Sequence, residues 1–242
     1  MKIKMALSLF LLAIIQNSFA AECSYDFNVN TYPVVSGKQY KFTTLSSNEA
    51  KEYGALRTLD GGLNNNFIYK GLPESGIYSF ELKSEVISYD LPDNEAVLLI
   101  YSILLKSNDS DYRIMVYYPN NSFYEDHKRT LIINMIKITN DVYSTIFKRS
   151  YQYSGLNQKL GFYFNQNTNQ IGLIINGINQ GYVANINDKL NQIGFFMSGG
   201  FPPFAANSSN LGKVLSQEFI FDHSQLSSGY PVGTKDICGN PL

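Results

Sequence analysis

Three observations predict an all-β fold, in which two antiparallel sheets form a β-sandwich of the jelly-roll type. Segments in which apolar and polar residues alternate recur along the chain, and this period of two is typical of strands buried on one face. Asn176-Gly177, a strong signal for a hairpin turn, joins two apolar segments. Helix signals are few, and strands that follow one another without regular helices between them favour a sandwich over βαβ units.

The alternating segments lie at residues 39–44, 77–83, 112–118, 160–164 and 217–221. In segment 112–118 the even-numbered residues, from Tyr112 to Tyr118, are apolar or aromatic. The odd-numbered residues are Arg113, Met115 and Tyr117. Because successive side chains of a strand point to opposite faces, Tyr117 and Tyr118 are predicted on opposite sides of the sheet.

Two further segments, 96–105 and 130–138, are nearly continuous in Val, Ile, Leu and Met. Such runs are typical of central strands covered on both faces, with a buried helix as the alternative. Residues 170–183 contain the Asn-Gly turn and are predicted to form a hairpin. In all, ten to thirteen strands are expected.

Helix signals are confined to two short stretches. Ser46 and Glu49 have the spacing of a capping box, with Gly54 as a possible stop. Asp222 and Gln225 suggest a single turn further on.

The composition excludes some classes of protein. Of 242 residues, 44% are hydrophobic and 14% aromatic, which is far from a disordered chain. Nineteen Lys and Arg against 20 Asp and Glu leave no basic excess, so we expect no nucleic-acid partner.

Residues 1–20 are predicted to be a signal peptide. Lys2 and Lys4 precede a short apolar run, and Ala20 follows in a small-residue cleavage pattern. The run is shorter than the roughly 20 residues of a membrane span, although an uncleaved anchor or a lipoprotein remain alternatives. Cleavage leaves residues 21–242, predicted to be one β-sandwich domain without a membrane span. We therefore expect export to the periplasm, the cell surface or the medium.

The two cysteines, Cys23 and Cys238, lie at the ends of the predicted mature chain. In an exported protein such a pair is expected to form a disulfide, with two free thiols as the alternative. A disulfide requires the two Cα atoms to lie within about 7 Å. The two ends of the domain are therefore predicted to meet.

The segment from Gln170 to Gly181, a strand, an Asn-Gly turn and a second strand, resembles a hairpin of concanavalin A-like lectin and glucanase sandwiches. In that superfamily a late strand returns to pair near the N-terminus, which the segment 219–222 resembles. The whole chain is similar to an uncharacterised family of exported Gram-negative bacterial proteins with paired terminal cysteines. This family implies no activity. The Glu-x-Asp-x-x-Glu strand of the glucanases is missing, and the chain has no Trp.

The sequence shows no catalytic motif, so we predict that the protein is not an enzyme. There is no Gly-x-Ser-x-Gly elbow. His127 and His223 each follow an acidic residue directly, and strand neighbours point to opposite faces. Glu81 and Glu85 have the spacing of a hydrolase pair. We expect a nearby turn to break their register and leave an exposed strand face.

No metal site or other cofactor is predicted, although calcium remains open. The cysteines and histidines lack zinc spacing. Oxygen-rich loops lie at 108–111 and around Asp60 and Asn64 to Asn66, without the full spacing of a calcium loop. Ordinary turn chemistry also explains them.

Tyr and Asn provide the candidate ligand-binding residues. A Tyr ring offers a stacking face and a hydroxyl, and an Asn amide both donates and accepts. The candidates are Tyr117, Tyr118 and Tyr124 around an Asn-Asn loop, Tyr153 and Tyr163 near a second polar loop, and Asn65 and Asn66. Good strand propensity explains the same tyrosines without a ligand.

These observations favour a secreted, non-enzymatic module that binds a surface glycan or polysaccharide. A structural or adhesion subunit is the alternative, using an exposed edge or the apolar tip 197–204. A glycoside hydrolase is the third functional hypothesis. The oligomeric state is left open by the sequence.

Overall fold

The computed structural model describes residues 23, 39–46, 53–54, 69–121 and 127–242. The predicted signal peptide, most of the predicted capping-box helix and the candidates Asn65, Asn66 and Tyr124 lie outside these residues. Gly54, expected to end that helix, lies in a short strand instead. The described part of the chain contains no α-helix.

Fourteen strands form two sheets in the described part of the chain, slightly more than expected because three of them have only two or three residues. The first, called here the β4 sheet, contains in spatial order β1 (Gln39–Thr43), β13 (Val214–Ile220), β4 (Ile77–Glu85), β9 (Asn157–Asn165), β10 (Gln170–Ile175) and β11 (Ile178–Asn185), with β14 (Thr234–Asp236) beside β4. The second, the β6 sheet, contains β2 (Tyr53–Gly54), β12 (Gln192–Gly200), β5 (Ala96–Lys106), β6 (Asp111–Asn121), β7 (Thr130–Thr139) and β8 (Val142–Gln152), with β3 (Lys70–Gly71) beside β12.

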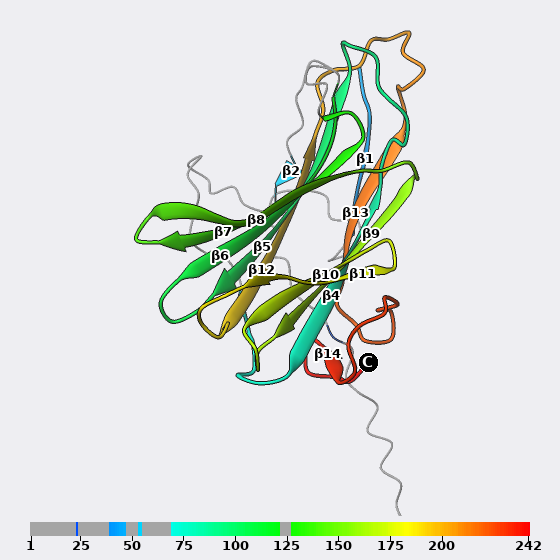
Figure 1. Cartoon of the computed structure of the whole chain (residues 1–242). Coiled ribbons are helices and arrows are strands. Elements are labelled where there is room, and N and C mark those ends of the chain that lie inside the picture. The colour runs from blue at the N-terminus through cyan, green and yellow to red at the C-terminus, as the bar shows by residue number, and fades with distance from the viewer. Residues whose placement is uncertain (1–22, 24–38, 47–52, 55–68, 122–126) are drawn as a thin grey trace, which may run out of the picture.

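The two sheets lie against each other, as Figure 1 shows. Every pairing between these strands is antiparallel except that of β14 with β4. The late strand β13 pairs with β1, the first strand described. The predicted all-β jelly-roll sandwich is confirmed.

The Asn-Gly hairpin is also confirmed. β10 ends at Ile175 and β11 begins at Ile178. Asn176 and Gly177 have φ angles of 47° and 85°, and two positive values define the turn whose twist matches that of paired strands. The Asn176 side chain accepts a hydrogen bond from the Lys159 amide at 2.8 Å, which ties the turn to β9.

The core between the sheets is aromatic. Phe80 of β4 contacts Phe195 of β12 with ring centroids 4.9 Å apart, and Phe195 contacts Phe219 of β13 at 5.0 Å. Phe201 and Phe204 of the apolar tip are buried as well, with centroids 5.8 Å apart. These two side chains therefore belong to the core and are not exposed for contact with a partner.

Tyr101 links the two sheets by hydrogen bonds. It belongs to β5, and its hydroxyl lies 2.8 Å from the Ser84 hydroxyl and donates to the Lys83 carbonyl at 2.6 Å. The same oxygen accepts from the Glu218 amide at 3.2 Å. Burial raises the pKa of Tyr101, so the hydroxyl is protonated at neutral pH.

Tyr101→Phe is therefore expected to lower the free energy of unfolding by about 1–3 kcal/mol, because buried groups of β4 lose their partner. Urea unfolding followed by circular dichroism measures the change. Tyr143→Phe is the matched control, since Tyr143 is 65% exposed and its loss should cost less than about 0.5 kcal/mol. Equal stability of the two variants would contradict this role for Tyr101.

Candidate functional site

The outer face of the β6 sheet carries an unusual set of polar groups in apolar surroundings. Along β6, the side chains of Tyr112, Ile114, Val116 and Tyr118 are buried between the sheets. Arg113, Met115 and Tyr117 point the other way and are half-buried. Sequence alternation thus placed Tyr117 and Tyr118 correctly on opposite faces.

The strand register brings a residue of β7 next to this group. Met115 pairs with Asn134 of β7 on one side and with Ser102 of β5 on the other. Arg113 and Tyr117 flank Met115 along the strand. We call Arg113, Met115, Tyr117 and Asn134 the Met115 site.

The polar atoms of the Met115 site lack good partners within the protein. The Arg113 Nε and the Asn134 Oδ1 are buried and make no hydrogen bond with any residue that the structure describes. The Tyr117 hydroxyl donates to the Met115 sulfur at 2.8 Å, and a thioether is a weak acceptor. Because buried polar atoms in folded proteins nearly always have a partner, either protein or ordered water, the Arg113 Nε and the Asn134 Oδ1 are available to bind water or a ligand.

The electrostatics of the site involve Tyr117 and Arg113. Burial raises the pKa of Tyr117, while the positive charge of Arg113 acts in the opposite direction. A guanidinium stabilises a phenolate by charge attraction. The pair can therefore hold an anionic group and transfer a proton, with the hydroxyl protonated at neutral pH.

Apolar residues surround the Met115 site on the same face. They occupy the neighbouring register positions and include Ile100, Leu104, Ile132, Ile136 and Phe196. Across the three rows of the register that contain Arg113, Met115 and Tyr117, the described residues of β12, β5, β6 and β7 include no Asp or Glu on this face. On these four strands, the three rows therefore offer a cation, an amide and a phenol, without a carboxylate pair.

The other candidate tyrosines lie elsewhere. Tyr118 and Tyr153 are buried together in the core, with ring centroids 5.9 Å apart. Tyr163 is buried on the outer side of the β4 sheet. Because these three rings are buried, they have no free face on which a sugar could stack. Among the predicted ligand-binding tyrosines that the structure describes, only Tyr117 remains a candidate for direct contact with a ligand.

Sequence reasoning missed Arg113 and Asn134. Arg113 and Tyr117 are both odd-numbered residues of the alternating segment 112–118, so the sequence pattern already placed them on the same face of the strand. Asn134 lies within the run 130–138, and its position beside Met115 depends on the register between β6 and β7. Local pattern alone cannot supply that register.

The expected hydrolase pair has a different environment from the one predicted. β4 continues through Glu85, so Glu81 and Glu85 share the outer face of the sheet and no turn breaks their register. Glu81 is fully buried rather than exposed. Its Oε1 accepts from the amides of Ser227 and Ser228 at 3.1 and 2.8 Å, and the Tyr230 hydroxyl lies 3.2 Å away.

Glu81 thus holds the C-terminal segment against the sheet. The Lys159 ammonium lies 3.8 Å from its second oxygen and donates to the Ser227 hydroxyl at 2.6 Å. The carboxylate makes Tyr230 harder to ionise, and together with burial it raises the pKa of that residue. Glu81 is fully buried by these contacts, which fit a structural role.

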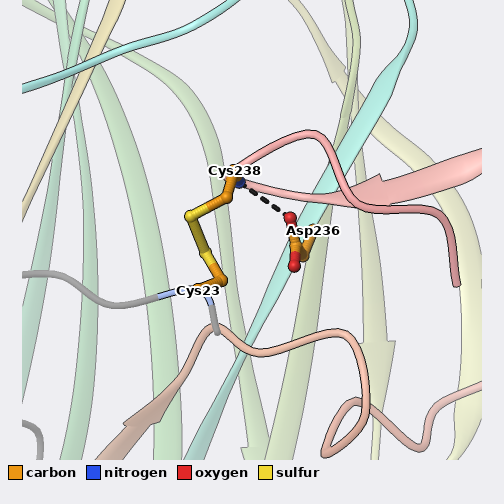
Figure 2. A group of neighbouring side chains, drawn as sticks. All are labelled: Cys23, Asp236 and Cys238. Atoms are coloured by element: carbon orange, nitrogen blue, oxygen red, sulfur yellow. Dashed lines mark hydrogen bonds between the residues drawn. A yellow bond between two sulfur atoms is a disulfide. The ribbon is translucent and has the colours of Figure 1, made fainter. Parts of the chain in front are cut away.

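The disulfide between Cys23 and Cys238 is present, with Cα atoms 5.6 Å apart. Asp236, on β14, accepts hydrogen bonds from the backbone amides of Cys238 and Asn240 at 2.8 and 2.9 Å. Figure 2 shows its carboxylate beside the sulfurs. The Asp236 carboxylate and both sulfurs lie within 4.8 Å of one another, but sulfurs joined in a disulfide are not thiolates and do not offer the metal ligand that a free cysteine would.

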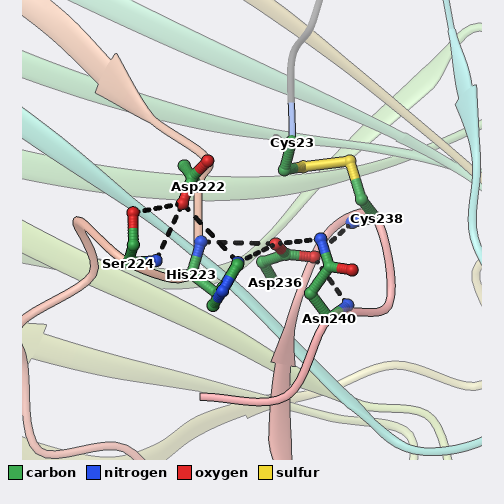
Figure 3. Close-up of a disulfide and its surroundings, with 7 residues drawn as sticks. All are labelled: Cys23, Asp222, His223, Ser224, Asp236, Cys238 and Asn240. Atoms are coloured by element: carbon green, nitrogen blue, oxygen red, sulfur yellow. Dashed lines mark hydrogen bonds and ion pairs between the residues drawn. A yellow bond between two sulfur atoms is a disulfide. The ribbon is translucent and has the colours of Figure 1, made fainter. Parts of the chain in front are cut away.

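A second carboxylate supports the other end of the disulfide. Asp222 accepts from the Ser224 hydroxyl and amide at 2.6 and 2.8 Å and from the backbone amide of Cys23. His223 lies between the carboxylates, with its Nδ1 3.5 Å from an oxygen of Asp222 and of Asp236 (Figure 3). Ser224 bonds Asp222 and not His223, so these residues lack the serine–histidine bond of a catalytic triad.

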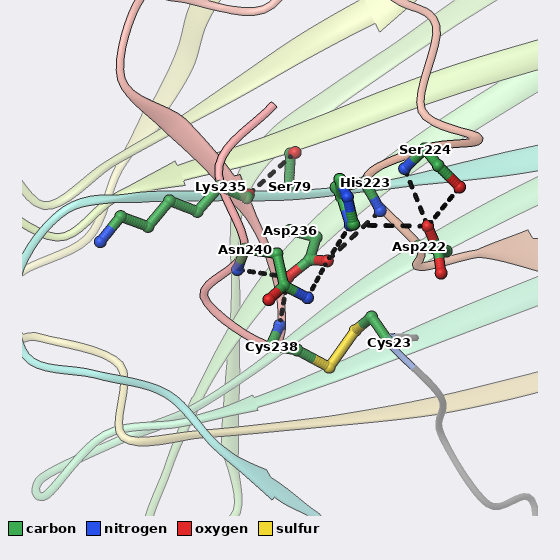
Figure 4. Close-up of polar contacts among 9 residues, drawn as sticks. All are labelled: Cys23, Ser79, Asp222, His223, Ser224, Lys235, Asp236, Cys238 and Asn240. Carbon is green, nitrogen blue, oxygen red and sulfur yellow. Dashed lines mark hydrogen bonds and ion pairs between the residues drawn. A yellow bond between two sulfur atoms is a disulfide. The ribbon is translucent and has the colours of Figure 1, made fainter. Parts of the chain in front are cut away.

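This cluster joins the chain ends to the β4 sheet. Ser79 of β4 donates to the Lys235 carbonyl of β14 at 3.2 Å, as Figure 4 shows. The turn predicted at Asp222 is present, because the Gln225 amide donates to the Asp222 carbonyl at 2.9 Å. The cluster is structural, and the expected meeting of the two chain ends is confirmed.

Asp222 gives a pH-dependent prediction. The Ser224 hydroxyl, the two backbone amides and His223 lower the pKa of this carboxyl, against a smaller opposing effect of burial. A carboxyl whose pKa is depressed on folding stabilises the protein above its unfolded pKa, and this contribution is lost as the pH falls through the folded value. Asp222→Asn should lower the free energy of unfolding by about 1–2 kcal/mol at pH 7. The difference from wild type should begin to shrink near the ordinary carboxyl pKa of about 4 and decrease further as the pH falls.

Urea unfolding between pH 3 and pH 7 tests this expectation. Asp93→Asn, at an exposed position, is the control and should remain equal to wild type throughout. A difference that stays constant with pH would show that the charge of Asp222 is not what stabilises the fold.

Among the described residues, no helix is long and apolar enough to cross a membrane. No curated protein matches the sequence. A family model described as "Domain of unknown function (DUF4882)" matches residues 135–240. This agrees with the resemblance to an uncharacterised family, whose Gram-negative origin stays a prediction.

Solved structures with a similar fold include polysaccharide-degrading enzymes. A glycosidic hydrolase is 12% identical with a TM-score of 0.36, and the match covers 60% of this chain and 64% of that one. The kappa-carrageenase of Pseudoalteromonas carrageenovora is 14% identical over 78% of this chain and 80% of its own, with a TM-score of 0.42. A family 7 alginate lyase is 13% identical over 78% and 79%, with a TM-score of 0.40. At these values the likeness is one of fold.

The expectation that the protein is not an enzyme is corrected by this comparison. The similar structures are described as hydrolases and a lyase.

Proposed function

We propose that the protein is a carbohydrate-active enzyme that cleaves an acidic polysaccharide at the Met115 site. The observation that supports this is the set of polar groups around Met115. Among the described residues, a guanidinium Nε and an amide oxygen have no hydrogen-bond partner, and the Tyr117 hydroxyl donates to a thioether. An arginine recognises carboxylates and sulfates by charge-assisted hydrogen bonds. The apolar surroundings strengthen that attraction.

Two kinds of chemistry break glycosidic bonds, and they need different residues. Hydrolysis uses two carboxylates roughly 5–10 Å apart, and the three register rows of the Met115 site contain none on β12, β5, β6 and β7. Elimination uses a base that removes the proton next to the sugar carboxylate and groups that stabilise the resulting charge. The Met115 site has groups suited to elimination.

In the proposed reaction, Arg113 and the amide of Asn134 hold the uronate carboxyl group. Tyr117, as the phenolate, takes the proton from the carbon beside that group. The electron pair forms a carbon–carbon double bond as the bond to the glycosidic oxygen breaks, and the Tyr117 hydroxyl returns the proton to that oxygen. Proton and electrons balance without a further reactant.

The disulfide supports a location outside the reducing cytoplasm, since such bonds persist in oxidising compartments. We propose that residues 1–20 direct export and that the enzyme meets its polysaccharide there. A calcium requirement stays a prediction.

The test is to incubate the mature chain with alginate, polygalacturonate and hyaluronan, each an acidic polysaccharide, and with neutral glucans. We expect shortened chains with a new unsaturated end from at least one acidic polymer and none from the glucans. Saturated products would instead support hydrolysis. Intact acidic polymers throughout would remove the basis for an elimination enzyme.

A further inference from the structure

The outer face of the opposite sheet carries a second patch, formed by β9, β10 and β11. In one row of the register Asn165 pairs with Gln170 and Gln170 with Asn185. In the next row toward the Asn-Gly turn, Tyr163 pairs with Gly172 and Gly172 with Tyr182. We call Asn165, Gln170, Tyr182 and Asn185 the Tyr182 patch.

A buried tyrosine supports the exposed one. A Cβ added to Gly172 would lie 1.9 Å from the Tyr163 ring, so Tyr163 lies directly against the backbone of β10 and only glycine fits beneath it. The Tyr182 ring contacts Tyr163 edge to face, with centroids 5.3 Å apart. Tyr163 is 2% exposed and Tyr182 is 41% exposed. Tyr163 thus fixes the ring of Tyr182, which faces solvent.

The amides of the patch are ordered by hydrogen bonds that use only part of their capacity. The Gln170 amide donates to Asn185 Oδ1 at 3.1 Å. The Asn165 amide donates to the Tyr182 hydroxyl at 2.7 Å. An amide side chain has two N–H donors and an oxygen acceptor, and a phenol has its own O–H. Gln170, Asn185 and Tyr182 therefore keep donors and acceptors for a ligand.

The patch is uncharged. Along β9, β10 and β11, no residue in its two register rows is acidic or basic. A charged ligand would find no opposite charge in these rows, whereas sugar hydroxyls both donate and accept, as amides do. The C–H face of a sugar ring can also pack on an exposed aromatic ring.

We propose that the Tyr182 patch binds an uncharged stretch of polysaccharide. It lies on the side of the sandwich opposite to the Met115 site, because each uses the outer face of its own sheet. The patch holds the polymer and takes no part in the chemistry, so it adds a binding function to the proposed enzyme and does not depend on it.

Native electrophoresis in gels that contain laminarin, glucomannan or galactan tests the proposal, since a bound polymer slows the protein. Wild type should be retarded by at least one of them. Tyr182→Ala should weaken that retardation at least about fivefold. Tyr182→Phe keeps the ring and should retain most of it, and Gln170→Ala should lower it while leaving Tyr182 in place.

Two controls separate this patch from other surfaces. Tyr143→Ala removes a tyrosine that is 65% exposed in the β6 sheet and should bind like wild type. Arg113→Gln should also bind neutral polymer normally, even though it should lose activity on acidic polymer. Cleavage by Tyr182→Ala of a short acidic oligosaccharide should be unchanged.

The proposal is overturned if no neutral polymer slows wild type, or if Tyr182→Ala and Gln170→Ala are both slowed as much as wild type. Loss of binding in Tyr143→Ala or Arg113→Gln to the same extent as in Tyr182→Ala would also overturn it. A failure of the Met115 site, by contrast, appears as intact acidic polymer while neutral binding persists.

Discussion

Tyr117→Phe is expected to lower kcat on an acidic polysaccharide by about 10²–10⁴-fold, the usual contribution of general acid–base catalysis. The variant keeps the ring and its packing and removes only the hydroxyl that transfers the proton. Since Arg113 and Asn134 still bind the sugar carboxyl group, KM should change little. Initial rates of unsaturated product formation give both constants.

Tyr143→Phe is the control for a lost phenol and should be fully active. Burial raises the pKa of Tyr117, so the phenolate fraction, and with it kcat of the wild type, should rise toward alkaline pH up to that pKa. Wild-type activity in Tyr117→Phe would exclude this hydroxyl as the proton-transfer group. Arg113→Gln should raise KM strongly, and an unchanged KM would exclude Arg113 from substrate binding.

Removal of the disulfide is expected to have the largest effect on stability. Cys23 and Cys238 are separated by 215 residues, and in the chain-entropy model closure of so long a loop contributes about 5 kcal/mol. The double variant Cys23→Ser, Cys238→Ser should therefore lose about 4–5 kcal/mol of unfolding free energy in urea.

Wild type treated with a reducing agent should unfold at the same urea concentration as the double variant. The Asp222 and Asp236 carboxylates still hold the amides of residues 23 and 238, so the folded structure itself should be retained. A loss below about 1 kcal/mol would show that the bond does not constrain the unfolded chain as the loop model requires.

The fold was predictable because its signals are local. Alternation in 112–118, the apolar runs of β5 and β7, and Asn176-Gly177 each report a property of neighbouring residues. The cysteine pair added one long-range constraint. The pairing of β14 with β4 carries no such signal, because a strand of three residues is too short to show a period.

The site was predictable only in part. Tyr117 was selected because Tyr is a good ligand residue, and its role in binding stays a prediction; the same reasoning selected Tyr118 and Tyr153, which lie in the core. Composition cannot tell these apart, whereas the phase of the alternation separates Tyr117 from Tyr118. Glu81 was misjudged for a related reason: its burial depends on a C-terminal segment more than 140 residues away.

The central claim is that the Met115 site receives an acidic sugar, and the Arg113 Nε–H group reports on it most directly. In 15N-labelled protein its resonance is identified by its disappearance in Arg113→Lys. Titration with an oligosaccharide of the acidic polymer should shift this resonance strongly, while a neutral oligosaccharide of equal length should leave it in place. An unmoved resonance at saturating acidic oligosaccharide would contradict the claim.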